Sequence, residues 1–234
     1  MEILEKIKAQ YQAKTTQEVV LKMHIALQIA DELGNNIEQI RTDFICLLEG
    51  CRSEAYNDTT GKKIIKGEKI DGCVTIGCGF NMSRTDAKKE WKIAGLKPNK
   101  FNKAFQGNIS LSEKEIFALL SSSLKIRENR LKQLIEDWAL LPSCVRIGLE
   151  SIYYNSPKAF DSILLDVKRY SETLCTRSLS KACDQLIKYQ HQNKTLHLAL
   201  QKRRELEAIM MQGKDYAKCE CKECFIDIIA QMVA

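Results

Sequence analysis

The first part of the chain has the hydrophobic periodicity of a helix. Apolar residues recur at helical spacing through Val20–Leu33, and Gly34 marks the end of that segment. Thr15 and Glu18 form a capping-box pattern that predicts where the helix begins. We expect this amphipathic helix to dock its apolar stripe on the main body of the protein, although another chain is the alternative partner.

A second periodic segment follows directly. Ile37–Leu48 places apolar side chains on one face of a predicted helix, and Asn36 is suited to cap its start. Glu49 falls at the C-terminal end, where the helix macrodipole disfavours a carboxylate. Helix stability therefore gives no reason for an acidic residue at this position.

The pattern changes between residues 52 and 82. Five glycines interrupt short apolar runs such as Lys63–Ile65 and Cys73–Ile76. This spacing predicts a small antiparallel sheet with hairpins.

Beyond residue 83 the helical periodicity returns and continues. Ser112 and Glu115 form another capping-box pattern, and Pro142 suits the start of a further helix. The last two predicted helices run from about Ser178 to Tyr189 and from about Thr195 to Met211. A small sheet lobe among helices is an α+β architecture, with residues 1–36 as an N-terminal helical extension and residues 217–234 as a Cys-containing tail.

Composition limits the functional classes. The hydrophobic content of 44% supports a globular core, and the formal charge of +6 suits an acidic partner without requiring one. Basic residues are not clustered with aromatic residues on one segment, which argues against a nucleic-acid binder. The most apolar stretch, Val19–Ala30, is interrupted by Lys22 and His24, and the N-terminus lacks the apolar region of a signal peptide. We therefore expect synthesis in the cytoplasm and no stable membrane insertion.

Cysteines and histidines indicate neither a disulfide framework nor a metal site. The ten cysteines are scattered, which in a chain of this length without a signal peptide indicates reduced, partly buried thiols. Three of them lie close together near the C-terminus, but a closed zinc site needs a fourth ligand and none is nearby in sequence. Metal binding by these three cysteines therefore stays open. We expect no metal or cofactor elsewhere in the chain. The three are Cys219, Cys221 and Cys224. His24, His191 and His197 show no triad or metal pattern and are expected to be surface or packing residues.

Two carboxylates in contrasting settings are the most informative chemical feature. Glu49 ends a helical segment, and Asp58 lies nine positions later in a turn-rich one. General acid/base hydrolysis needs two carboxyl groups whose pKa values are pushed apart by their surroundings. Thr75, in a glycine-punctuated strand, adds a hydroxyl group.

Three short segments together form a recognisable signature. Glu49-Gly50 is followed by Tyr56-Asn57-Asp58-Thr59-Thr60-Gly61 and then by Thr75-Ile76-Gly77-Cys78-Gly79. This order and the spacing from Glu49 to Asp58 resemble the phage-type lysozymes of glycoside hydrolase family 24, whose pattern is Glu-Gly, Tyr-x-Asp-x-x-Gly and Thr-Ile-Gly-x-Gly. Weaker similarity extends the resemblance over roughly residues 37–216.

The resemblance implies a lysozyme-like catalytic domain at residues 37–216, with a β lobe at about 52–82 and a mostly helical lobe. Glu49 would be the general acid, Asp58 the ionised carboxylate that stabilises positive charge on the sugar or helps activate a water, and Thr75 the residue that holds this water. Space for a water implies inversion, with carboxyl groups roughly 6.5–9.5 Å apart. The residues implied in substrate binding are Tyr56, Gly77, Gly79, Asn81 and Asn155.

The chain departs from the family pattern in one long insertion. Thirteen residues separate Gly61 from Thr75, far more than in the family pattern. The added residues, 62–72, form either a longer solvated hairpin or a flap whose lysines contact an anionic wall polymer. They also introduce Asp71 as a rival to Asp58, which we prefer because Tyr56 and Gly61 flank it at the family spacing.

The expected function is that of a lysozyme (muramidase), which hydrolyses the β-1,4 bond between N-acetylmuramic acid and N-acetylglucosamine in bacterial peptidoglycan. The alternatives are a lytic transglycosylase and a catalytically silent peptidoglycan-binding protein on the same scaffold. Because the cell wall lies outside the cytoplasmic membrane, a holin or an export system would have to deliver the chain. A phage endolysin, a virion component and a bacterial effector stay open, as does the oligomeric state.

Overall fold

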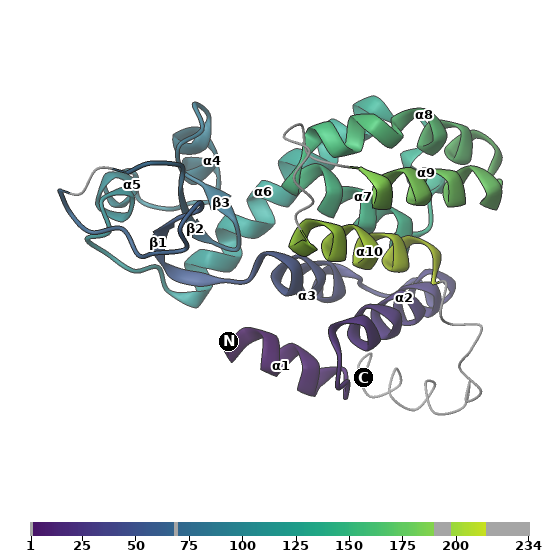
Figure 1. Cartoon of the computed structure of the whole chain (residues 1–234), viewed down its shortest axis with the longest axis horizontal. Helices are drawn as coiled ribbons and strands as arrows, with labels where there is room; N and C mark the ends of the chain where they lie inside the picture. Colours follow the sequence, from purple (N-terminus) through teal and green to yellow (C-terminus); the bar gives the residue numbers. More distant parts are fainter. Residues whose placement is uncertain (1, 68–69, 190–197, 214–234) are drawn as a thin grey trace. The chain divides into compact units, whose positions relative to one another are not determined.

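The computed structural model describes residues 2–67, 70–189 and 198–213. The chain forms two compact units: Ile45–Ile126 together with the start of the chain, and Glu5–Phe44 together with the described residues from Arg127 onward. It passes from one unit into the other within helices α3 (Glu38–Glu49) and α6 (Glu113–Leu134). Helices predominate beside one small sheet, so the α+β prediction is confirmed (Figure 1).

The first unit contains a three-stranded antiparallel sheet in the order β1-β2-β3. Its strands are β1 (Arg52–Asn57), β2 (Val74–Gly77) and β3 (Phe80–Asn81), within the region where the glycine pattern predicts strands. Helix α5 (Pro98–Phe105) packs against β1 and against α4 (Ala87–Ile93).

Aromatic rings fill the core beside this sheet. The Trp91 ring meets the Phe101 ring edge to face at a centroid distance of 5.3 Å, and it lies 6.4 Å from the Phe80 ring. Edge-to-face pairs of this kind add to the free energy gained from burying their apolar surface. The β lobe therefore has a core of its own.

The second unit is entirely helical over its described residues. Helix α7 (Ser143–Asn155) contacts α2 (Thr16–Leu33), α8 (Pro157–Thr173) and α10 (Leu198–Gln212). Helix α10 also packs on α2 and on α9 (Thr176–Lys188). The remaining helical elements are α1 (Glu2–Gln10) and the 3₁₀ helix η1 (Trp138–Leu140).

Helix α2 is docked through its apolar face, as its periodicity predicts. Val20, Met23 and Leu27 are fully buried, and α2 contacts α7 and α10. The segment before Asn36 therefore supplies part of the core of the second unit.

Local capping signals are confirmed. The Thr15 hydroxyl accepts the Glu18 N–H at 3.1 Å while the Glu18 carboxylate accepts the Thr15 N–H at 3.1 Å. The same reciprocal pair links Ser112 and Glu115 at 3.3 and 3.0 Å. Each pair satisfies backbone donors that the first turn of a helix leaves without an intrahelical partner.

Later helix boundaries fall close to the predicted ones. Pro142 directly precedes α7, and α9 begins at Thr176 rather than Ser178. Helix α10 ends at Gln212, and Gly213 follows it at φ +59°. The predicted start at Thr195, His191, His197 and the tail at 217–234 with its three cysteines lie outside the described residues.

His24 is a packing histidine, as expected. Its side chain is buried, and its Nδ1 lies 2.7 Å from the carbonyl oxygen of Met210. Burial lowers the pKa of His24, although the contact with Met210 acts in the opposite direction. The imidazole thus ties α2 to the end of α10.

The prediction that the cysteines are all reduced is wrong for one pair. Cys51 and Cys78 form a disulfide across 27 positions of sequence. The β2–β3 turn brings Cys78 back beside the start of β1, a proximity that cysteine spacing alone does not reveal. The other described cysteines whose thiols are retained are Cys46, Cys73, Cys144, Cys175 and Cys183.

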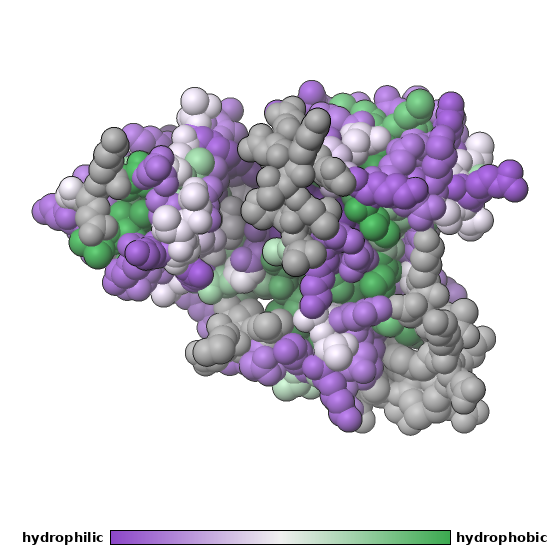
Figure 2. Space-filling view, in the orientation of Figure 1, coloured by the Kyte–Doolittle hydropathy of each residue, from purple (hydrophilic) through white to green (hydrophobic). Residues whose placement is uncertain are grey.

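The described surface is largely hydrophilic in the view of Figure 2. The large apolar side chains that are exposed among the described residues are Leu33, Ile65, Ile93, Leu140, Leu165 and Leu174. Among the described helices, none has the length and apolar character needed to cross a membrane.

Candidate active site

Glu49 is placed by an abrupt end to helix α3. Gly50 follows it at φ +64°, and the Gly50 N–H donates to the carbonyl of Cys46 at 2.9 Å. A positive φ at this point suits glycine because it has no Cβ. The chain then turns directly into β1, so the last helical residue lies next to the sheet.

The Glu49 carboxyl group rests against the backbone of Gly79. A Cβ atom built on Gly79 would lie 2.6 Å from Oε2 of Glu49, and the Oε1 atom is shielded from solvent. Gly79 also has φ +74°. A side chain at position 79 would therefore force the Glu49 carboxyl group to move, and the positive φ also favours glycine, which accounts for one glycine of the sequence motif.

The sheet register aligns three predicted site residues. Tyr56 of β1 pairs with Thr75 of β2, and Thr75 pairs with Asn81 of β3. Directly opposed residues of antiparallel strands project to the same face. Tyr56, Thr75 and Asn81 therefore form a row across one face of the sheet, in which Thr75 is only 5% exposed.

Asp58 is held just beyond the end of β1. Its backbone N–H donates to the Cys73 carbonyl at 3.0 Å, and its carboxylate accepts the Cys73 N–H at 2.8 Å. The neighbouring turn is closed instead by Asn57, whose side-chain oxygen accepts the N–H groups of Thr59 and Thr60. Because Asn57 supplies the hydrogen bonds that close this turn, the Asp58 carboxylate is not needed for them, and Asp58 is exposed.

Tyr56 lies within the electrostatic reach of both carboxylates. Burial raises the pKa of the Tyr56 phenol, the charge of Glu49 raises it further, Arg52 lowers it, and Asp58 raises it. Glu49 at the end of α3 and Asp58 just beyond β1 thus both act electrostatically on the Tyr56 phenol. This shared electrostatic neighbour is the feature that links the two carboxylates.

Arg52 belongs to the same group, although no motif points to it. Its guanidinium lies 4.3 Å from the centroid of the Tyr56 ring, and it donates to the Gly61 carbonyl at 2.6 Å. A cation over an aromatic ring is attracted by the ring quadrupole. Regular strand alternation would put residues four apart on one face, but the register of β1 on β2 shifts between Arg52 and Tyr56, so the sequence alone does not predict this contact.

The insertion begins as a continuation of the sheet. Asn57 donates its N–H to Lys62 at 2.8 Å, and Ile64 donates to Ala55 at 2.9 Å. The buried Ile64 reaches Gly107, where a Cβ atom would collide with the Ile64 carbonyl oxygen. The first part of the insertion is therefore a docked segment along β1.

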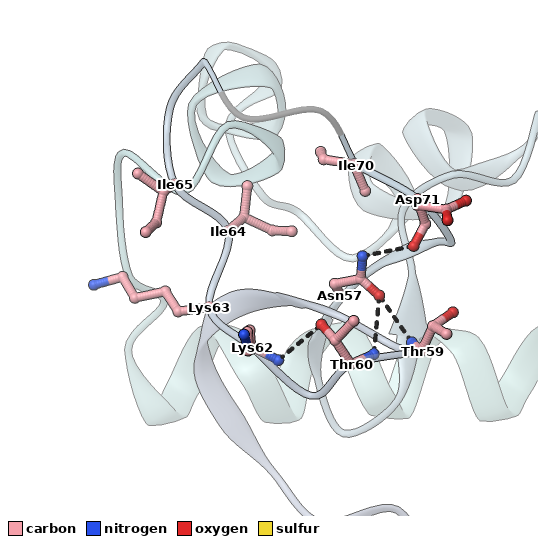
Figure 3. Close-up of a pocket in the computed structure, with 9 residues that line it drawn as sticks. All are labelled: Asn57, Thr59, Thr60, Lys62, Lys63, Ile64, Ile65, Ile70 and Asp71. Atoms are coloured by element: carbon pink, nitrogen blue, oxygen red, sulfur yellow. Dashed lines mark hydrogen bonds between the residues drawn. The ribbon is translucent and has the colours of Figure 1, made fainter.

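A pocket of about 240 Å³ lies between this segment and the β1 turn (Figure 3). Asp71 lines it, and the Asp71 carbonyl accepts the Asn57 side-chain N–H at 2.7 Å. Of the lysines that line it, Lys63 is paired with Glu54 at 2.5 Å. Asp71 is thus a wall of this pocket, whereas Asp58 bonds to the start of the β2 segment at Cys73.

The remaining predicted substrate contacts have structural partners. Gly77 ends β2 at φ +63°, and a Cβ atom there would lie 3.6 Å from Ile116. The Asn81 side-chain oxygen accepts the Ser83 N–H at 2.8 Å. Asn155 belongs to the second unit, where its side-chain oxygen accepts a bond from Arg204 at 2.6 Å.

This arrangement has the components of acid/base chemistry. One carboxyl group is packed against backbone with an oxygen shielded from water, a second is exposed, and a hydroxyl-bearing residue lies in register with the tyrosine near both. No protein-family model, curated protein or solved structure matches this chain. The functional assignment therefore depends on the motifs and on this geometry.

Proposed function

We propose that this protein is a lysozyme that hydrolyses the β-1,4 bond between N-acetylmuramic acid and N-acetylglucosamine in peptidoglycan. The observation that carries the proposal is the strand register that sets Thr75 opposite Tyr56, whose phenol lies within electrostatic reach of both Glu49 and Asp58. The lysozyme-like fold is part of the same proposal. The cell wall is then the site of action, and delivery across the membrane depends on another factor.

Glu49 acts as the general acid in this proposal. It protonates the glycosidic oxygen as the bond to the leaving sugar breaks. Its packing against Gly79 holds the carboxyl group in one place, and a fixed orientation lowers the entropic cost of reaching the transition state. A contribution of about 10²–10⁴-fold to the rate is typical of a positioned general acid.

Asp58 and Thr75 act on the opposite side of the reacting sugar. The negative charge of Asp58 stabilises positive charge as it develops at the anomeric carbon. Thr75 orients the water that attacks this carbon, which inverts its configuration. The backbone bond from Cys73 keeps Asp58 in position for this role.

The test is the release of reducing ends from purified peptidoglycan. The wild-type protein should release reducing ends, whereas Glu49→Gln should not. Glu54→Gln is the control, because it exchanges a partly exposed glutamate of strand β1 in the same way, and it should also release them. Products that end in anhydromuramic acid would indicate a lytic transglycosylase instead. Binding to peptidoglycan without any cleavage by the wild type would indicate a silent binding protein.

A further inference from the structure

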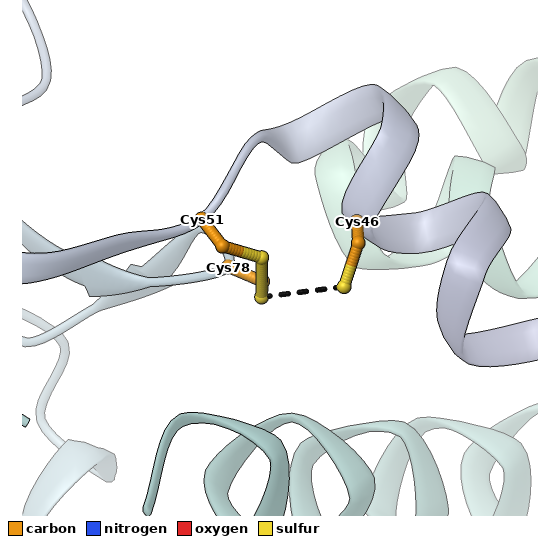
Figure 4. Close-up of a disulfide and its surroundings, with 3 residues drawn as sticks. All are labelled: Cys46, Cys51 and Cys78. Atoms are coloured by element: carbon orange, nitrogen blue, oxygen red, sulfur yellow. Dashed lines mark hydrogen bonds between the residues drawn. A yellow bond between two sulfur atoms is a disulfide. The ribbon is translucent and has the colours of Figure 1, made fainter. Parts of the chain in front are cut away.

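Three cysteine sulfurs gather at the point where α3 meets the β2–β3 turn (Figure 4). The Sγ atoms of Cys46, Cys51 and Cys78 all lie within 4.8 Å of one another. Cys51 and Cys78 are joined by the disulfide, and Cys46 retains its thiol. A disulfide and a thiol therefore share one small cluster.

The thiol is in contact with one particular sulfur of the disulfide. The Sγ of Cys46 lies 3.5 Å from the Sγ of Cys78. Because the Cys78 sulfur carries no hydrogen in the disulfide, the S–H of Cys46 must be the donor in this contact. Thiol–disulfide exchange begins with the approach of a thiol sulfur to a disulfide sulfur, so Cys78 is the sulfur placed for attack.

We propose that the disulfide isomerises between Cys51–Cys78 and Cys46–Cys78. The thiolate of Cys46 attacks the Sγ of Cys78, a bond forms between these two sulfurs, and the bond from Cys78 to Cys51 breaks. Cys51 leaves as a thiolate and takes up the proton that Cys46 has lost. One disulfide and one thiol are present before and after, so the step needs neither an oxidant nor a reductant.

The exchange changes how the segment around Glu49 is tied to the sheet, and its consequence for catalysis rests on the proposed lysozyme function. Cys46 lies three residues before Glu49 on α3 and Cys51 lies two residues after it. Cys78 is bonded in sequence to Gly79, the residue against which the Glu49 carboxyl group rests. The Cys46–Cys78 bond would tie the β2–β3 turn to a residue before Glu49, whereas the Cys51–Cys78 bond ties it to a residue after Glu49. Only the Cys51–Cys78 form therefore holds Glu49 in the observed position.

Disulfide mapping tests the isomerisation without any activity assay. The full chain is equilibrated in a glutathione redox buffer, quenched with acid, blocked with N-ethylmaleimide and cleaved after glutamate. Cleavage after Glu49 separates Cys46 from Cys51, and fragmentation of the linked peptide 69–90 distinguishes Cys78 from Cys73, so the two pairings are told apart. We expect peptides with Cys46–Cys78 as well as Cys51–Cys78. The absence of any Cys46–Cys78 peptide from the wild-type protein would overturn the proposal.

Two variants, each with one cysteine replaced by serine, isolate the two disulfide forms. Cys46→Ser should contain the Cys51–Cys78 bond and no alternative to it in this cluster, and Cys51→Ser should form Cys46–Cys78. Maleimide on both Cys46 and Cys78 in oxidised, folded Cys51→Ser would also contradict the proposal. Cys175→Ser, an exposed position in the second unit, is the control and should show the wild-type mixture.

The lytic rate of these variants tests the link to Glu49. A displacement of about 1 Å at a catalytic group can cost about 100-fold in rate, so oxidised Cys51→Ser should be about 100-fold slower than Cys46→Ser. Equal lytic rates in these two variants would overturn the proposed effect of the disulfide exchange on Glu49. If the wild type releases no reducing ends, the lysozyme proposal fails, while the mapping result still decides whether the exchange occurs.

Discussion

At the scale of single residues, the contact between Glu49 and Gly79 is the most demanding feature of the site. A glutamate at the end of a helix usually extends into solvent. Here the Glu49 carboxyl group lies so close to Gly79 that a Cβ atom built on residue 79 would be only 2.6 Å from Oε2 of Glu49. The position of the proposed acid therefore depends on the absence of a side chain at Gly79.

Gly79→Ala should remove activity by displacing this carboxyl group. The added methyl group cannot share the space with Oε2, so we expect about a 100-fold loss of lytic rate. Gly95→Ala is a matched control, since Gly95 has φ +76° against +74° for Gly79 but nothing within 4 Å of its Cβ position. Both variants should lose about 1–2 kcal/mol of stability from the left-handed backbone conformation. Lytic assays and urea unfolding measure the two effects, and equal activity in the two variants would contradict this account of the site.

Two substitutions decide whether Asp58 or Asp71 is the second catalytic carboxylate. Asp58→Asn should lower the rate of reducing-end release by about 100-fold or more, because the exchange removes the charge near the reacting sugar. Asp71→Asn should keep most of the activity, because the part of Asp71 that holds the turn is its backbone carbonyl. The reverse pattern would make Asp71 the catalytic residue.

The features that the structure confirms from the sequence are local ones, such as the two capping boxes, which depend on neighbours a few positions away. The roles of Glu49, Asp58 and Thr75, which stand in a motif of fixed order, stay predictions. Arg52 over Tyr56 and the Cys51–Cys78 disulfide were missed, because both depend on the bulged register of β1 on β2 and on the return of the β2–β3 turn. Such pairings are determined by tertiary structure.

At the scale of elements, the insertion is docked through its first residues. Lys62 and Ile64 exchange backbone hydrogen bonds with β1, and the Ile64 carbonyl lies against Gly107 after α5. The sequence pattern did not distinguish a solvated hairpin from a flap. The hydrogen bonds to β1 and the burial of Ile64 together show that this part of the insertion belongs to the β lobe.

Gly107→Ala should detach the insertion from the lobe. The new methyl group would collide with the Ile64 carbonyl, and exposing a buried isoleucine costs about 1.5–3 kcal/mol. Limited trypsin digestion should then cut faster after Lys62, Lys63 and Lys66 than in the wild type. Gly95→Ala again controls for the backbone conformation. Unchanged digestion in Gly107→Ala would mean that this contact does not hold the insertion.

At the scale of the whole molecule, a buried charge cluster affects the stability of the second unit. Arg41 of α3 contacts Glu150 of α7 at 2.6 Å and Glu128 of α6 at 3.6 Å. Burial raises the pKa of Glu150 to about 7, more than the attraction of Arg41 lowers it. The unit thus contains a carboxyl group that ionises near neutral pH.

This cluster predicts how stability changes with pH. The pKa of Glu150 in the folded state, about 7, exceeds the ordinary value of 4.5, so the folded protein retains a proton that the unfolded chain has released. The contribution of Glu150 is therefore complete below about pH 4.5 and is lost as the pH rises through 7. At about 1.4 kcal/mol per pKa unit, a shift from 4.5 to about 7 makes this loss at most about 3–4 kcal/mol.

Urea unfolding at pH 5 and pH 8 measures this contribution. Glu150→Gln, which cannot ionise, should lose less stability between the two pH values than the wild type. If wild type and variant show the same change with pH, Glu150 is not the group responsible.

The central claim is that Glu49 is the general acid of a peptidoglycan hydrolase. Its most direct test is the release of reducing ends from purified peptidoglycan by the wild type, Glu54→Gln and Glu49→Gln, each shown to be folded by circular dichroism. We predict equal release by the first two and a loss of about 10²–10⁴-fold in Glu49→Gln. Full activity in folded Glu49→Gln would contradict the account.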